Sequence, residues 1–307
     1  MKLLDYWRIS RPDNIAKHIF IIPGIVLAII YQPFQIDYLE NIFLGILSSI
    51  LAASANYTIN EFVDHKTDKF HPLKKNRALL KININKSKII TFYVSLVIFS
   101  ILLAMNVNKY FTYTVLVFLF SGIIYNIKPF EFKNKIYLDI LNEALNNPIR
   151  LFLGWYMIFS DLSLIPPISF ILFYFFVGAF LMTSKRLSEI IFFKKFGNIR
   201  SLIKYRSNYK YYDQTNLTIA AIFFLMLISF NSAIFLIKYR IELILVYPVI
   251  TILFTLYFYM TIKSPEKGVF PEKVYLDKYI IILTLISFIL FFILYNFDMN
   301  FLNPLLK

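Results

Sequence analysis

The chain has 307 residues, of which 59% are hydrophobic, 19% are aromatic and only 16% are charged. A soluble domain carries about a quarter charged residues, so this composition excludes a soluble globular protein and indicates a polytopic membrane protein. The net charge of +14 does not indicate a nucleic-acid-binding protein, because the basic residues lie between the apolar runs, and the absence of cysteine excludes disulfides, thiol catalysis and cysteine-ligated metals.

Nine apolar runs approach the ~20 residues that a helix needs to cross a bilayer. The first run follows a charged N-terminal segment without a small-residue cleavage signature, so we expect a retained span and not a signal peptide. The sequence therefore predicts an all-α integral membrane protein with residues 1–307 as a single transmembrane domain. The predicted spans cover about residues 15–31, 42–60, 89–107, 110–127, 137–158, 166–184, 216–237, 243–262 and 279–297.

The loops between these runs differ strongly in charge. The N-terminal segment and the second, fourth, sixth and eighth loops hold 27 of the 32 Lys and Arg residues, whereas the other loops and the C-terminal tail hold four. Because basic residues are enriched in cytoplasmic loops, this bias places the N-terminus and the even-numbered loops in the cytoplasm. The second and sixth loops are the most basic, so we expect a site built from them to open to the cytoplasm.

Acidic side chains follow the second apolar run directly. If that helix continues, Asn60, Asp64 and Asp68 lie on one face, since they are four residues apart. Carboxylates that share a face repel each other unless a cation lies between them. This spacing therefore indicates a site for Mg²⁺, which prefers oxygen ligands, with Glu61 beside it.

The segment after this helix is basic. Pro72 ends the helix, and the cations that follow it are typical of anion binders. Carboxylates for Mg²⁺ and cations for phosphate together predict a diphosphate-binding site. The alternative, an ordinary solvated loop, is disfavoured because the acids begin inside the helix end. The basic residues are Lys74, Lys75 and Arg77.

The fifth predicted span contains polar side chains that are costly in a membrane. Asp139, Glu143, Asn146 and Arg150 fall within about 40° of one line along a helix. Because a charge facing lipid costs ~2.5–3.5 kcal/mol or more, we expect this stripe to face the bundle interior and to line a polar cavity. The alternative is an internal salt bridge between Arg150 and an acid elsewhere.

The sixth predicted span ends in Lys185-Arg186-Leu187-Ser188-Glu189. Arg186 and Glu189 are three residues apart, so they could pair on the helix surface, for ~0.2–0.5 kcal/mol. Lys185 adjoins the apolar run, where a charge needs a partner or a phosphate. We interpret this segment either as an ordinary basic helix end or as a second phosphate-binding group.

The motif Asn60-Glu61-x-x-Asp64-x-x-x-Asp68 resembles the first motif of the UbiA superfamily of intramembrane prenyltransferases, in which Asp is usual where this chain has Glu61. The resemblance implies a nine-helix bundle around a central cavity that opens to lipid. It also implies that Asn60, Glu61, Asp64 and Asp68 hold Mg²⁺.

Within this superfamily the chain is most similar, over about residues 11–210, to the decaprenyl-phosphate phosphoribosyltransferases. Other prenyltransferases of the superfamily carry a second acidic cluster in place of the last shared group. The chain departs from the branch at Glu61, at Ala78 and at the Leu187-Ser188 pair. The shared groups are Arg11, Pro12 and Lys17; His71, Pro72, Lys74 and Arg77; Tyr125 and Lys128; Asp139; Arg150 and Gly154; and Lys185, Arg186 and Glu189.

This similarity implies transfer of a phosphoribosyl group from phosphoribosyl pyrophosphate, a phosphorylated sugar donor, to a polyprenyl phosphate in the membrane. Asp64, Asp68 and Lys185 would carry catalysis by binding Mg²⁺ and the leaving pyrophosphate. The lipid phosphate is already a good nucleophile, so no strong general base is required. The implied substrate-binding residues are Lys17, Lys74, Arg77, Tyr125, Lys128, Asp139, Arg150, Arg186 and Glu189.

Two other functions stay open. Ordinary prenyl transfer, from a polyprenyl diphosphate to a small or aromatic acceptor, would use the first motif equally well. One acid and two cations in the sixth loop, however, fit one metal-bound pyrophosphate plus a further phosphate better than two metal clusters. A transporter or channel is compatible with intramembrane Asp and Arg, although nothing outside the motif loops suggests a path to the other face.

Overall fold

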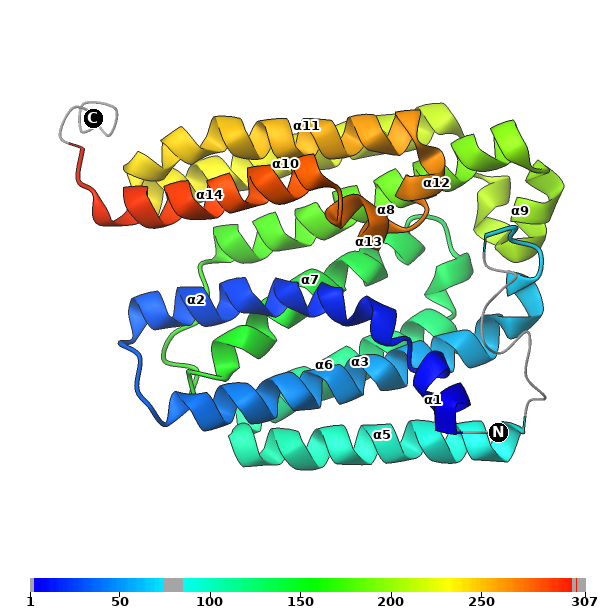
Figure 1. Ribbon diagram of the computed structural model, residues 1–307, viewed down its shortest axis with the longest axis horizontal. Coiled ribbons are helices and arrows are strands. Elements are labelled where there is room, and N and C mark those ends of the chain that lie inside the picture. Colours follow the sequence, from blue (N-terminus) through cyan, green and yellow to red (C-terminus); the bar gives the residue numbers. More distant parts are fainter. Residues whose placement is uncertain (1–2, 74–84, 300–301, 303–307) are drawn as a thin grey trace. The chain divides into compact units, whose positions relative to one another are not determined.

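The computed structural model describes residues 3–73, 85–299 and 302, which form helices and no strand (Figure 1). The chain divides into two compact units. Unit 1 comprises Met1–Pro166 and Asn198–Tyr212, and unit 2 comprises Pro167–Gly197 and Asp213–Lys307. The sixth loop is therefore split, because its second half folds with the first half of the chain. That residues 1–307 act as one transmembrane domain stays a prediction.

Unit 1 is built from helices that follow the predicted spans and from short elements between them. α3 and α5 lie side by side along their length (Figure 1). The elements of unit 1 are α1 (Leu3–Ile9), η1 (Pro12–Ile21), α2 (Ile22–Tyr31), α3 (Tyr38–Asp68), α5 (Lys86–Val107), α6 (Lys109–Asn126), η2 (Phe132–Asn134), α7 (Leu138–Tyr156), α9 (Ile199–Tyr205) and η3 (Ser207–Lys210).

Unit 2 contains α8, which packs most extensively against α10, and the helices that follow. Its core is aromatic: the Phe180 ring centroid lies 5.6–5.9 Å from those of Phe254, Tyr257 and Phe258. The elements of unit 2 are α8 (Ile168–Phe196), α10 (Gln214–Tyr239), η4 (Ile241–Val246), α11 (Tyr247–Lys263), α12 (Pro265–Gly268), α13 (Pro271–Tyr275) and α14 (Lys278–Asn296).

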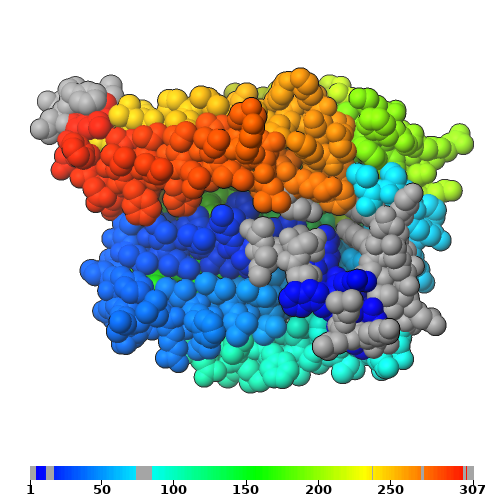
Figure 2. Space-filling view, in the orientation of Figure 1, coloured from blue at the N-terminus to red at the C-terminus, as the bar shows by residue number. Residues whose placement is uncertain are grey.

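Each of the nine predicted spans is helical in the structure, which confirms the all-α prediction. Within the described part of the chain, six helices are long and apolar enough to cross a membrane, and Lys17–Tyr31 is a shorter apolar helix. The count of nine spans is therefore not confirmed. The helix α14, orange to red in Figure 2, shows why a membrane is needed: Leu285 and Phe292 on it are more than half exposed.

Two glycines let α2 and α7 approach closely in unit 1. A Cβ added to Gly154 would lie 2.8 Å from the Ile25 nitrogen and 3.0 Å from the Gly24 Cα. Backbone atoms cannot move aside as a flexible side chain does, so this crossing requires glycine. Small residues at helix crossings are typical of packing inside membranes. The crossing fixes α7, which carries the polar stripe of the fifth predicted span.

Candidate functional site

The acidic motif occupies the C-terminal end of α3. The helix remains regular to Asp68, so Asp64 and Asp68 share a face as their spacing predicts. The side chains of Glu61, Asp64 and Asp68 are buried, with at most 3% of each residue exposed. Burial of carboxylates is costly unless cations or hydrogen-bond donors accompany them, so this helix end must be supplied with positive charge by other parts of the chain.

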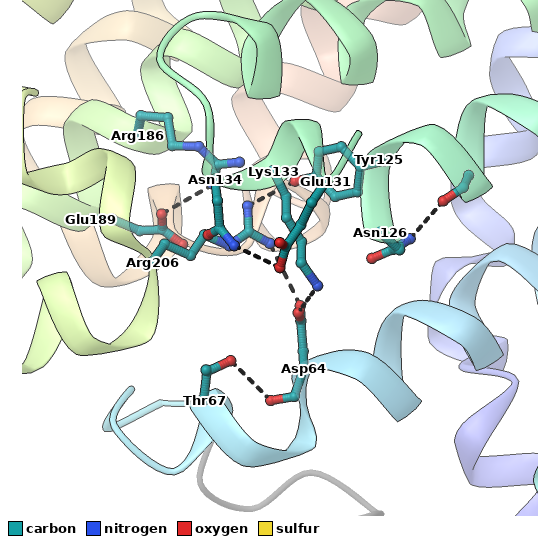
Figure 3. A network of polar contacts seen from close by, with 11 residues as sticks. Asp64, Thr67, Tyr125, Asn126, Glu131, Lys133, Asn134, Arg186, Glu189 and Arg206 are labelled. Carbon is teal, nitrogen blue, oxygen red and sulfur yellow. Dashed lines mark hydrogen bonds and ion pairs between the residues drawn. The ribbon is translucent and has the colours of Figure 1, made fainter. Parts of the chain in front are cut away.

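Two buried cations hold Asp64. Lys133 Nζ donates a hydrogen bond to Asp64 Oδ1 over 2.5 Å, and Arg206 Nη2 lies 3.6 Å from Asp64 Oδ2 (Figure 3). Arg206 Nη1 also donates to the Tyr125 hydroxyl at 2.7 Å, and its guanidinium lies 5.6 Å from the Tyr125 ring centroid and 5.3 Å from that of Tyr205. The Asp64 carboxylate thus contacts η2 through Lys133 and the segment after α9 through Arg206, which in turn contacts the end of α6.

The loop between α6 and α7 is bent so that Lys133 is buried, with 3% of the residue exposed. Glu131 and Tyr137, on either side of η2, have φ values of 40° and 58°. Non-glycine residues seldom adopt this left-handed region, and such strain persists where the surroundings enforce it. Asn134 Nδ2 donates to Glu131 Oε1 at 2.9 Å, which braces the bend.

Tyr212 holds the segment 198–212 against the rest of unit 1. The Tyr212 hydroxyl donates to Asp139 Oδ1 at 2.6 Å and accepts from the Tyr137 nitrogen at 2.7 Å. Asp139 is fully buried in the first turn of α7. Asp139, predicted to bind substrate, therefore helps to hold the segment that carries Arg206.

The rest of the polar stripe on α7 follows the prediction in part. Arg150 is buried and Glu143 and Asn146 are partly buried, so the stripe is turned away from the surface. The Arg150 guanidinium lies 5.4 Å from the Phe118 ring centroid. Arg150 forms no ion pair with any residue that the structure describes, so the salt-bridge alternative is not supported.

In unit 2, Arg186 and Glu189 pair as their spacing predicts, with Nη1 3.2 Å from Oε2 (Figure 3). The pair does not lie on the helix surface, because the two side chains are 1% and 0% exposed. Ser188 Oγ, on the same helix, donates to the Thr261 carbonyl at 3.1 Å. A Cβ on Gly268 would overlap Ser188 Oγ, so α12 packs directly on the Lys-Arg-x-x-Glu motif.

The other predicted residues differ in their burial. Lys17 is partly buried, with Nζ 5.6 Å from the Tyr57 ring centroid, and Lys185 is also partly buried. Lys128 is exposed. Lys74 and Arg77 lie outside the described residues, so their role stays a prediction.

Sequence reasoning missed Lys133, Arg206 and Tyr212. Lys133 and Arg206 are two of many cations in the basic loops, and no spacing separates them from their exposed neighbours. The sequence does contain a signal, because Tyr209, Tyr211 and Tyr212 gather in an otherwise polar loop. Tyr209 and Tyr212 are buried in the structure, whereas Tyr211 is exposed.

The oxygen donors on α3 fit Mg²⁺. The side-chain Oδ1 of Asn60 is buried and accepts no hydrogen bond from the described residues. The same residues contain no preformed group of three or more His, Asp or Glu side chains arranged around a metal position. Mg²⁺ is usually bound by one or two carboxylates together with water and substrate phosphates, so it does not require a complete set of protein ligands.

Comparison with solved structures finds the same fold. A UbiA homologue from Archaeoglobus fulgidus bound to GPP and Mg²⁺ is 18% identical, with 93% of this chain and 96% of that chain covered and a TM-score of 0.59. A structure of digeranylgeranylglyceryl phosphate synthase is 20% identical, with 94% and 97% covered and a TM-score of 0.63. No curated protein matches the chain. The model of the UbiA prenyltransferase family matches residues 20–276, and the chain therefore belongs to this family of membrane transferases.

Proposed function

We propose that the protein transfers a phosphoribosyl group from phosphoribosyl pyrophosphate to a polyprenyl phosphate, with Mg²⁺, at the cytoplasmic face of the membrane. The observation that carries this proposal is the contrast between two helices. α3 ends in buried carboxylates, whereas α8 carries Arg186 and Glu189 as a buried pair beside Lys185. One acidic group serves one metal-bound pyrophosphate, and the cations of α8 suit a further phosphate.

The residues of this chain would act by binding and orientation. Asp64 and Asp68, with Asn60 and Glu61, would hold the Mg²⁺, which when bound neutralises charge on the departing pyrophosphate. In the reaction the bond between the anomeric carbon and the pyrophosphate oxygen breaks, and a bond from that carbon to a lipid phosphate oxygen forms. The nucleophile arrives deprotonated, so the site needs no base.

The cations have a matching role. Lys185 and Arg186 would bind phosphate oxygens, as would Lys17, Lys128 and, outside the described residues, Lys74 and Arg77. For Lys185 and Arg186 this role rests on their chemistry and on the motif. The polyprenyl tail, being apolar, would stay in the bilayer while its phosphate reacts.

A second candidate is ordinary prenyl transfer from a polyprenyl diphosphate. The UbiA homologue of Archaeoglobus fulgidus, whose structures contain GPP or DMAPP with Mg²⁺, favours it. The α3 motif would serve a prenyl diphosphate as well as a sugar diphosphate. The two reactions differ in the donor, a sugar or a prenyl diphosphate, and in the acceptor, a polyprenyl phosphate or a small or aromatic molecule.

The test uses purified protein, Mg²⁺, a polyprenyl phosphate and labelled phosphoribosyl pyrophosphate. A labelled lipid is expected. Asp64→Ala should abolish its formation, whereas Asp161→Ala, at an exposed loop aspartate, should leave it unchanged. If no labelled lipid forms but a prenyl diphosphate and an acceptor give product, the donor is a prenyl diphosphate and the first proposal is wrong.

The orientation can be tested separately, because the chain has no cysteine. Single cysteines at the exposed positions Lys66 and Asp161 can be labelled with a membrane-impermeant maleimide on intact cells. We expect Asp161→Cys to be labelled from outside and Lys66→Cys only after the membrane is opened. The reverse pattern would place the acidic end of α3 on the outer face.

A further inference from the structure

A groove lies between α1 and the first turns of α5, both in unit 1 (Figure 1). Its volume is about 410 Å³, within the range of pockets that hold small ligands. The ring centroids of Tyr6 and Phe92 are 5.0 Å apart, so these two side chains connect the helices. The groove therefore combines apolar surface with hydroxyl groups and one ammonium group. Its lining residues are Tyr6, Ser87, Lys88, Thr91 and Phe92.

The two helices that form the groove carry more positive than negative charge. Lys86 and Lys88 lie in the first turn of α5 and Arg8 in the last turn of α1, and all three are exposed. None of them forms an ion pair with a residue that the structure describes. α5 contains no acid and α1 contains one, Asp5, so the surroundings of the groove favour an anion.

α1 has the side chains of a helix that lies at a membrane surface. Ile9 is fully buried, whereas Trp7 is 63% exposed and precedes the exposed Arg8. Tryptophan is enriched where lipid headgroups meet hydrocarbon, and amphipathic helices with aromatic and basic side chains lie in that plane. We therefore expect the groove to lie at the level of the lipid phosphates.

The face of α5 that continues from the groove is apolar and exposed. At about 100° per residue, Ile98 and Leu102 lie on the same side of the helix as Thr91. Phe99 lies beside them, and the three apolar side chains are 50–59% exposed. From Thr91 to Leu102 the helix rises about 16–17 Å, close to half of the ~30 Å hydrocarbon core of a bilayer. An acyl chain that begins at the groove can therefore follow α5 to the middle of the membrane.

We propose that this groove binds an anionic glycerophospholipid of the surrounding membrane, with its phosphate beside Lys88 and one acyl chain along α5. The phosphate pairs with the ammonium group and accepts hydrogen bonds from the hydroxyls that line the groove. The bound lipid adds to the ring contact between Tyr6 and Phe92 and so holds α1 against α5. The site lies apart from the carboxylates of α3, and neither candidate reaction depends on it.

The experiment uses the fluorescence of Trp7 as its reporter. The chain has two tryptophans, and the other, Trp155, is fully buried, so a Trp7→Phe variant gives the Trp155 signal for subtraction. The full-length protein is reconstituted into phosphatidylcholine bilayers that contain brominated phosphatidylglycerol or brominated phosphatidylcholine with the same chains. Bromine quenches tryptophan only at short range, so the ratio of quenching by the two lipids measures their relative association with α1.

In the wild type, phosphatidylglycerol should quench Trp7 more strongly than phosphatidylcholine does. Lys88→Gln should lower this preference about fivefold, because one basic residue at a lipid surface contributes roughly that factor. Lys109→Gln is the matched control, since it removes an exposed lysine from the first turn of α6, and it should leave the preference unchanged. Thr91→Phe keeps every charge but fills the groove, so it should also lower the preference.

Equal quenching by the two lipids in the wild type would overturn the proposal. A preference that is lost in Lys88→Gln but retained in Thr91→Phe would result from surface charge alone, and the groove would then not be a lipid site. Displacement of phosphatidylglycerol by a small mole fraction of polyprenyl phosphate would show that the groove takes the acceptor substrate, which also contradicts the proposal. Quenching does not require turnover, so the result is independent of which donor the protein uses.

Discussion

Removing the hydroxyl of Tyr212 should loosen the 198–212 segment without substituting a charged residue. Tyr212→Phe removes one hydrogen bond to the Asp139 carboxylate, at 2.6 Å, and one from the Tyr137 nitrogen, at 2.7 Å. The ring, which is 7% exposed, keeps its packing. The variant therefore isolates the two polar contacts.

The magnitude follows from the kinds of bond. A hydrogen bond to a charged group contributes about 1.5–3 kcal/mol and a neutral one about 0.5–1.5 kcal/mol, so the segment should lose roughly 2–4 kcal/mol of local stability. Since about 1.4 kcal/mol corresponds to a factor of ten, the opening equilibrium should rise at least about 30-fold.

Hydrogen exchange followed by mass spectrometry measures this opening directly, because amide protection reports local unfolding free energy. The amides of residues 198–212 should exchange at least about 30-fold faster in Tyr212→Phe, while those of α5 should be unchanged. Tyr211→Phe is the matched control, since the neighbouring Tyr211 is 62% exposed. Exchange at the wild-type rate in Tyr212→Phe would refute the role of this contact.

Three further predictions concern packing and binding. Gly154→Ala should lower the thermal stability of the detergent-solubilised protein by about 1–3 kcal/mol, because its Cβ meets the backbone at Gly24; an unchanged melting temperature would contradict the crossing. Gly268→Ala should displace Ser188 and raise the KM for the donor. An unchanged KM would show that the contact of α12 with the motif does not affect donor binding. Lys185→Ala should also raise the KM for the donor, and if it does not, this lysine is an ordinary basic helix end.

The helices and the acidic face of α3 could be predicted from sequence because each depends on neighbours along the chain. Apolar runs and four-residue spacing are local patterns, and they located α3, its carboxylates and the buried face of α7. The pairing of Arg186 with Glu189 could also be predicted from their spacing along the chain. The burial of the pair could not, because burial depends on contacts with residues distant along the chain, which leave no periodic signal.

The partners of Asp64 could not be predicted for the same reason. Lys133 and Arg206 are 69 and 142 positions away from it along the chain, and they reach it because the two loops fold back onto α3. Lys128, a predicted substrate-binding residue, lies five residues before Lys133 in the same loop and is exposed, whereas Lys133 is buried. Only the bend at η2 separates a buried lysine from an exposed one.

The length of α3 has a consequence for where two substrates can meet. Its 31 residues rise about 46 Å, whereas the hydrocarbon of a bilayer is about 30 Å thick. If Tyr38 lies at one boundary of the hydrocarbon core, the last roughly ten residues of the helix, about Thr58 to Asp68, project beyond the other boundary. In that placement, the regular helix holds its carboxylates at the depth of the lipid headgroups. In the proposed reaction, the lipid phosphate would reach that plane while its tail stays in the hydrocarbon, and the phosphorylated sugar would reach it from the water.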